Sequence, residues 1–171
     1  NGTHTECVGH ITDERISIRD CLRDVLMDAV LISVDPSGPS NFSLMSDDDQ
    51  IIPAEDIENA IMSANLSLLD SDRALIVRTL PNTDEKLTRE YGTDNAGAVK
   101  IPPYFTEDAM RYIVECGFTH LLCDLPSIDR IHDDGKLLNH RIFWNVEPES
   151  REITDQTRVT STITELIYVP D

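Results

Sequence analysis

The sequence predicts an α/β fold, because strand-like and helix-like segments alternate along the middle of the chain. Residues 73–80 (RALIVRTL) are mostly apolar and precede Pro81, a pattern typical of a buried strand. Residues 106–117 (TEDAMRYIVECG) have helical character, and residues 118–124 (FTHLLCD) have the character of a second strand. This order of strand, helix and strand is the main observation in favour of the α/β class.

Two further elements come earlier in the chain. The apolar run of residues 25–34 ends in the turn-rich sequence DPSGPS, so its second half predicts a buried strand. A helix is expected to begin with Pro53 in its first turn, where the acidic Glu55 and Asp56 favour the positive end of the helix dipole. Three apolar residues are expected on one face of this helix: Ile57, Ile61 and Met62.

The later elements have recognisable boundaries. Thr106 suits the N-cap of the helix over residues 106–117, and Gly117 suits its end. Residues 82–104 are polar and contain Gly and Pro, which predicts a long loop. Residues 157–169 (TRVTSTITELIYV) are rich in β-branched side chains and therefore predict a long final strand.

The composition indicates one globular domain and argues against several classes of partner. The chain has 171 residues, of which 40% are hydrophobic and 27% charged, so it is long enough to bury a core. Its net charge of −18 repels nucleic acid and anionic lipid. No apolar run approaches the ~20 residues that a membrane span requires.

The four cysteines do not have the spacing of a zinc knuckle, because none of them forms a CxxC pair. Cys116 and Cys123 lie in apolar stretches and are expected to be reduced and largely buried. The low cysteine content does not suggest a secreted disulfide scaffold, so the cytoplasm is the expected location.

The opening stretch NGTHTECVGH contains a pair of possible metal ligands. His4 and Glu6 are two residues apart, so on a strand they share one face, and imidazole with carboxylate suits zinc or manganese. His10 would lie ~20 Å from His4 in an extended chain, so the chain must bend at Gly9 for His10 to act there as an acid–base group. Two alternatives remain: a polar surface, or a glycosylation acceptor at Asn1, with similar patterns at Asn41 and Asn65.

Two residues later in the chain are also unusual for their surroundings. His140 is flanked by apolar residues, and Glu165 stands inside an otherwise apolar strand, so each needs a compensating partner if it is buried. A shared metal would satisfy both. By contrast, His120 is expected to be a satisfied residue of a strand, and His132 to be solvated in an acidic turn.

Four stretches of the chain resemble segments of the cyclase family, which includes the bacterial kynurenine formamidases and the isatin hydrolases. GTHTECVGH (2–10) resembles the signature H-x-G-T-H-x-D-x-P-x-H, and LLCDLPSID (121–129) resembles the family's D-x-x-S-x-D stretch. NHRIFW (139–144) and ITELIYV (163–169) are similar to its later histidine and glutamate regions. The four stretches follow one another in the family's order.

The chain also departs from the family pattern. The first histidine of the signature falls immediately before Asn1, the signature's aspartate is Glu6, and its proline is Val8. Members of the family are longer at both ends. We therefore expect residues 1–171 to form a single cyclase-like domain that is incomplete at both ends.

The resemblance implies a swivelling β/β/α fold with a divalent metal, zinc or manganese, at its centre. Carried over position by position, it implies a catalytic His10 and the metal ligands His4, Glu6, His140 and Glu165. Glu152 is a rival to Glu165, since it lies nearer to His140 in sequence, but its surroundings are charged rather than apolar.

The implied function is hydrolysis of a C–N amide bond in a small formamide or cyclic amide by metal-activated water, as in an arylformamidase or an isatin hydrolase. His10 would transfer protons between the water and the leaving nitrogen. The alternative is a non-catalytic acidic module for metal binding or assembly with the same fold, which Glu6 and the missing first histidine favour. We expect a cytoplasmic homo-oligomer with a small-molecule substrate and with neither nucleic acid nor membrane as a partner.

Overall fold

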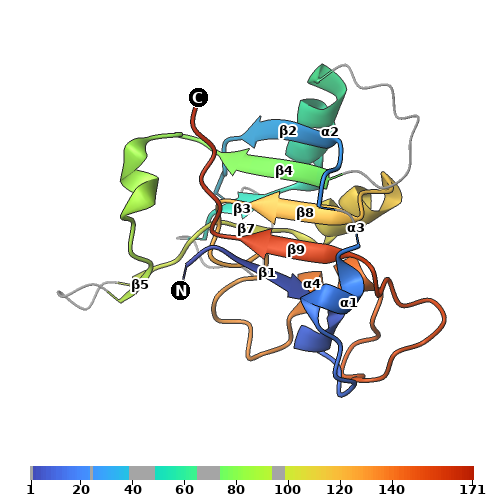
Figure 1. Ribbon diagram of the computed structural model, residues 1–171. Helices are drawn as coiled ribbons and strands as arrows, with labels where there is room; N and C mark the ends of the chain where they lie inside the picture. The colour runs from blue at the N-terminus through green and yellow to red at the C-terminus, as the bar shows by residue number, and fades with distance from the viewer. Residues whose placement is uncertain (1, 24, 39–48, 65–73, 94–98) are drawn as a thin grey trace.

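A five-stranded sheet forms the centre of the computed structural model, which describes residues 2–23, 25–38, 49–64, 74–93 and 99–171 (Figure 1). The strand order is β1-β9-β8-β4-β2. Four strands run parallel, and β1 pairs antiparallel with β9. The strands are β1 (His4–Cys7), β2 (Ala29–Val34), β4 (Ala74–Thr79), β8 (His120–Cys123) and β9 (Thr162–Glu165).

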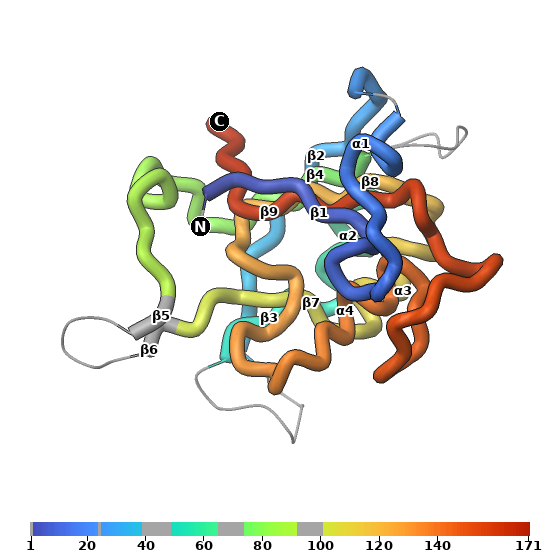
Figure 2. Tube along the Cα trace, turned by 60° about the horizontal axis from the view of Figure 1, so that its bottom comes forward, coloured from blue at the N-terminus to red at the C-terminus, as the bar shows by residue number. Residues whose placement is uncertain are grey.

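Three helices connect successive parallel strands. They are α2 (Ala54–Ser63), α3 (Glu107–Glu115) and α4 (Leu138–Trp144). Figures 1 and 2 show that they lie side by side on one face of the sheet. The short elements are α1 (Ile18–Cys21), the 3₁₀ turns η1 (Val8–His10) and η2 (Asp84–Leu87), and two small sheets: β3 (Ile51–Ile52) with β7 (Tyr104–Phe105), and β5 (Gly92–Thr93) with β6 (Val99–Lys100).

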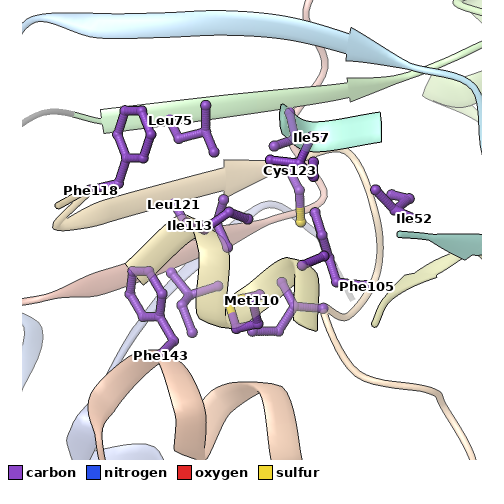
Figure 3. Packing of buried hydrophobic residues seen from close by; sticks show 14 of the residues in the cluster. Ile52, Ile57, Leu75, Phe105, Met110, Ile113, Phe118, Leu121, Cys123 and Phe143 are labelled. Carbon is purple, nitrogen blue, oxygen red and sulfur yellow. The ribbon is translucent and has the colours of Figure 1, made fainter. Parts of the chain in front are cut away.

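The core fills the space between the sheet and these helices. Figure 3 shows Leu75 and Leu121 from the sheet above Met110 and Ile113 of α3 and Phe143 of α4, all of them fully buried. Burying one such side chain stabilises the fold by about 1.5–3 kcal/mol. The packing therefore fixes α4 against the sheet, which matters because α4 carries His140.

The predicted α/β class is confirmed, and so are most of the elements behind it. Strands occupy the second half of residues 25–34 and most of residues 73–80 and 118–124. In α3, the Thr106 hydroxyl accepts a hydrogen bond from the backbone N–H of Ala109 at 3.2 Å, as its expected role of N-cap requires. Gly117 has a φ of 82°, which lets the chain leave the helix.

Two details of the helix α2 were predicted wrongly. Pro53 is the N-cap and not a residue of the first turn. Ile57 and Ile61 are buried, but Met62 is 69% exposed. Because Met62 follows Ile57 by five residues, it is turned by about 140° around the helix axis and leaves the apolar face.

One segment has more regular structure than the sequence predicts, and another segment has less. The expected loop of residues 82–104 contains η2, β5 and β6, whose two-residue strands are too short for any periodicity to reveal. The final strand covers only Thr162–Glu165 of the predicted residues 157–169. It ends because Leu166 adopts a φ of 54°, outside the strand region.

All four cysteines are free thiols. Cys123 is buried as predicted, whereas Cys116, the C-cap residue of α3, is only partly buried. Asn1, Asn41 and Asn65, the possible glycosylation acceptors, lie outside the described residues. Among the helices that the structure describes, none has the length and apolar character needed to cross a bilayer.

Candidate metal centre

The pairing of β1 with β9 brings three of the candidate ligands to one face of the sheet. His4 and Glu6 share a face of β1, and the register places His4 directly opposite Glu165. His4 Nε2 lies 3.2 Å from Glu6 Oε1 and 3.5 Å from Glu165 Oε2. The buried Ile163 lies two residues before Glu165 on β9, so this face is the one that α4 covers.

The helix α4 supplies His140 from above this face. Leu137 adopts a left-handed conformation before the helix, and His140 follows in the first turn with its side chain 2% exposed. His140 Nε2 lies 3.1 Å from Glu6 Oε2 and 3.7 Å from Glu165 Oε1. The indole of Trp144, one helical turn further on, packs with its centroid 5.5 Å from the imidazole.

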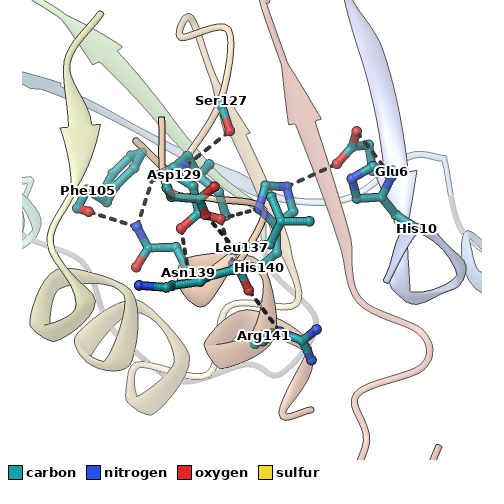
Figure 4. A network of polar contacts seen from close by, with 12 residues as sticks. Glu6, His10, Phe105, Ser127, Asp129, Leu137, Asn139, His140 and Arg141 are labelled. Atoms are coloured by element: carbon teal, nitrogen blue, oxygen red, sulfur yellow. Dashed lines mark hydrogen bonds and ion pairs between the residues drawn. The ribbon is translucent and has the colours of Figure 1, made fainter. Parts of the chain in front are cut away.

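The 3₁₀ turn η1 returns His10 to the same place. A Cβ atom at Gly9 would lie 2.2 Å from the carbonyl oxygen of Ile16, so the bend requires glycine for lack of space. His10 Nδ1 lies 3.9 Å from Glu6 Oε1, and its ring centroid lies 5.6 Å from that of His140. Figure 4 shows His10 beside Glu6. The His10 side chain is 44% exposed, so His10 can exchange protons with solvent.

The structure thus brings together all five residues singled out in the sequence. Their donor atoms form two overlapping groups, each with all atoms within 4.8 Å of one another: His4, Glu6 and Glu165, and Glu6, His10 and His140. Glu152, the rival to Glu165, is exposed on a separate segment. Cys7 points to the opposite face of β1, where its thiol donates to the Ile16 carbonyl. The roles of ligand and catalyst stay predictions.

The electrostatics of the cluster reflect an excess of buried carboxylate. Burial disfavours the charged form of His140, but hydrogen bonds to Asp129 and Glu6 outweigh burial and raise the pKa of His140 to about 9. Burial raises the pKa of Glu165 to about 7. Burial acts in the same direction on Glu6, yet its hydrogen bond with His140 and the nearby histidines lower the pKa of Glu6 overall. Protons therefore compensate these carboxylates in the absence of another cation.

The donor set fits a divalent transition metal. Imidazole nitrogens and carboxylate oxygens are the ligands that zinc accepts, and manganese accepts the same set with more oxygen. His140 presents Nε2 to the two glutamates because its Nδ1 is engaged by Asp129 at 2.6 Å. A carboxylate behind a histidine ligand is a recurrent arrangement around metals in proteins.

Asp129 is a residue of this region to which the sequence assigned no role. It is 5% exposed, and its two carboxylate oxygens accept hydrogen bonds from the Asn139 backbone and the His140 ring. The sequence did contain a signal for Asp129, because it is the last residue of LLCDLPSID, the stretch that resembles the family's D-x-x-S-x-D pattern. What could not be read from the sequence is the contact with α4.

A cavity of about 570 Å³ is lined by residues adjacent in sequence to the cluster, but by none of the five cluster residues themselves. Its lining includes Thr3 and Leu166, the chain neighbours of His4 and Glu165. Residues between Lys86 and Tyr91 form another part of its wall. The space suits a small organic molecule.

Comparison with known families gives one match that covers most of the chain. Residues 1–130 match the model of the family named Cyclase, described as "Putative cyclase". A comparison with functionally curated proteins finds no match.

Three solved structures are similar to this chain in fold. One is described as a potential metal-dependent hydrolase with cyclase activity (15% identity, TM-score 0.56, covering 100% of this chain and 64% of that one). Another is isatin hydrolase A from Labrenzia aggregata (12% identity, TM-score 0.59, covering 98% of this chain and 60% of that one). A third is a novel cyclase (18% identity, TM-score 0.51, covering 88% of this chain and 43% of that one). The chain spans less than two thirds of the length of each. At these identities the likeness establishes the fold, which is the α/β fold that the sequence predicts.

Proposed function

The chain belongs to the cyclase family, and on this premise we propose that it carries the metal centre of a hydrolase that cleaves a C–N amide bond in a small formamide or cyclic amide. One observation carries the proposal. Two imidazoles and two carboxylates from β1, α4 and β9 converge on one partly buried point, although the residues lie far apart in the sequence. Such a convergence of charged side chains is rare unless a cation balances it.

The residues that would hold zinc or manganese are His4, Glu6, His140 and Glu165. A bound divalent ion lowers the pKa of its water from 15.7 towards ~7 and polarises a carbonyl oxygen. The chain's own contribution is to hold these donors in a largely water-excluded position beneath α4. Their exposed side is at His4, whose side chain is 37% exposed, so substrate would approach from there.

His10 is the group suited to move protons in this reaction. It lies at the rim of the cluster, 3.9 Å from Glu6, and is exposed enough to exchange its proton with solvent. It would take a proton from the attacking water and give one to the leaving nitrogen, so that the nitrogen departs as a neutral amine.

The cavity lined by Thr3 and Leu166, the chain neighbours of His4 and Glu165, is the proposed place of the substrate. Its volume of about 570 Å³ accommodates one or two rings. Isatin hydrolase A, one of the structures with a similar fold, was solved with benzyl benzoate bound. A small aromatic or cyclic amide is therefore the substrate class that we propose.

Metal analysis together with a hydrolysis screen tests the proposal. The purified protein should contain at least about one equivalent of zinc or manganese per chain. With one of these metals bound, it should hydrolyse N-formylkynurenine, isatin or a simple lactam. A protein that binds metal but hydrolyses none of these substrates would favour the alternative, a non-catalytic metal-binding or assembly module. A protein that binds neither metal contradicts the proposed centre itself.

A further inference from the structure

The segment Asp124–Asp129, which follows β8, touches two of the proposed ligands at once. The backbone N–H of Ile128 donates a hydrogen bond to Glu165 Oε1 at 2.9 Å. The next residue, Asp129, accepts one from the His140 ring at 2.6 Å. One short segment therefore contacts a ligand on β9 and a ligand on α4. Figure 4 shows the second of these contacts, between Asp129 and His140.

Asp129 is itself held firmly. Its Oδ1 accepts the backbone N–H of Asn139 at 2.7 Å, and its Oδ2 accepts His140 Nδ1. Its own backbone N–H donates to Ser127 Oγ at 3.2 Å. The Asn139 amide donates to the Ile128 carbonyl at 2.9 Å and to the Phe105 carbonyl at 2.7 Å, which ties the segment to α4 and to β7.

The other end of the segment is anchored to the sheet. Asp124 accepts hydrogen bonds from the backbone N–H and the hydroxyl of Thr79 at the end of β4, at 2.9 and 3.0 Å. It also pairs with the buried ammonium group of Lys86 at 2.7 Å. These partners of Asp124, Thr79 and Lys86, are not among the proposed ligands.

We propose that Asp129 is a positioning residue, which sets the orientation of His140 so that Nε2 faces Glu6 and Glu165. A carboxylate only accepts hydrogen bonds, so Nδ1 of His140 carries a hydrogen and Nε2 is the nitrogen left to bind a metal. The inference rests on the metal centre of the proposed function. It also assigns a task to the D-x-x-S-x-D-like stretch, which the hydrolytic mechanism does not use.

Asp129→Asn separates this role from a purely structural one. An amide offers one acceptor oxygen, so it cannot serve both the Asn139 N–H and the His140 ring. Asp124→Asn is the matched control, because it removes the same charge from the same segment at similar burial while its partners are Thr79 and Lys86. Zn²⁺ affinity, measured by competition with a chromophoric chelator, gives a readout that does not depend on activity.

We expect Asp129→Asn to weaken Zn²⁺ binding by about 10–100-fold and to alter the visible spectrum of the Co²⁺-substituted protein. Asp124→Asn should change the affinity by less than about threefold. In a His140→Ala background, Asp129→Asn should have no further effect on affinity, because its effect passes through His140. An undiminished effect in that background, or wild-type affinity and spectrum in Asp129→Asn, would overturn the proposal.

A measurement on the wild-type protein covers the case in which Asp129→Asn does not fold. In the Zn²⁺-loaded protein labelled with ¹⁵N-histidine, His140 should carry its ring hydrogen on Nδ1. A ring hydrogen on Nε2 contradicts the positioning role even though metal is bound. A wild-type protein that binds neither Zn²⁺ nor Mn²⁺ contradicts the proposed function and this inference together, so the two failures are distinguishable.

Discussion

His4 and Glu165 are paired residues of β1 and β9, and their side chains meet with His4 Nε2 3.5 Å from Glu165 Oε2. The antiparallel pairing places a nitrogen donor and an oxygen donor from distant parts of the sequence on the same face. Glu165 is 3% exposed, so its charge has little access to water. The first prediction follows from this burial.

Glu165→Gln should change stability and metal affinity in opposite directions. Glutamine resembles the protonated form of Glu165 that burial favours, and its oxygen can still accept the Ile128 N–H. At pH 8 in the presence of EDTA, we therefore expect the free energy of unfolding to increase by about 1–3 kcal/mol. Zn²⁺ affinity should fall by at least about tenfold, because an anionic ligand is lost.

Urea denaturation and chelator competition measure these two effects. Glu152→Gln is the control, since Glu152 is exposed and lies outside the cluster. It should alter the unfolding free energy by no more than about 0.5 kcal/mol. Equal effects of the two substitutions on Zn²⁺ affinity would remove Glu165 from the centre.

The metal-free protein should lose stability as the pH rises from about 5 to about 9. The pKa values of Glu165 and His140 are raised to about 7 and about 9, so the folded state binds more protons than the unfolded state in this window. The slope of unfolding free energy against pH is therefore negative there. Thermal or urea denaturation in EDTA across this range measures it.

Saturating Zn²⁺ should reverse the slope over the same range, because metal binding requires deprotonated ligands. Replacing His140 by glutamine should flatten the metal-free curve between pH 7 and pH 9, where that side chain titrates. A metal-free wild-type protein that becomes more stable from pH 6.5 to 9 is incompatible with the protonated cluster.

His10→Ala should retain metal and fold but lose turnover. His10 lies at the exposed rim, whereas His4 bridges both glutamates of the sheet. We expect kcat to fall about 10²–10⁴-fold with a smaller change in KM. Metal analysis and steady-state kinetics on His10→Ala, His4→Ala and the control His132→Ala check this. Loss of metal in His10→Ala would make His10 a ligand.

Gly9→Ala should destabilise the protein and displace His10. The added Cβ would lie 2.2 Å from the Ile16 carbonyl oxygen, a backbone atom that cannot move without shifting the chain. A loss of about 1–3 kcal/mol is expected from urea denaturation. Gly38→Ala is the matched control, because its Cβ would meet nothing within 4 Å. A Gly9→Ala protein as stable as the control would disprove the close approach.

The sequence predicted the elements whose signals are local. Thr106 and Gly117 bracket α3, and the apolar runs of β4 and β8 are long enough to identify strands. The helix α4 escaped assignment because it is short and begins after a left-handed Leu137 without a side-chain cap. The pairs β5–β6 and β3–β7 are defined by tertiary contact, and two-residue strands have no pattern of their own.

The candidate site was likewise predicted where the sequence signal is local and missed where a tertiary contact defines the role. The spacing of His4 and Glu6 places both on one strand face, and Glu165 stands out by its apolar neighbours. Resemblance to a family linked these residues to His140. Asp129 gained no role because its partner lies on α4, and contact between a post-strand turn and a helix is a property of the folded chain alone.

The pairing of β1 with β9 also has a consequence for folding, because its two strands are far apart in the sequence. Strands β2, β4 and β8 join neighbours that are close in sequence, whereas β1 must wait for β9 to be synthesised. Closing so large a loop is entropically unfavourable and slows folding, so this pairing is expected to form last. A divalent ion that binds only the completed cluster would then stabilise the pairing of β1 with β9 by mass action.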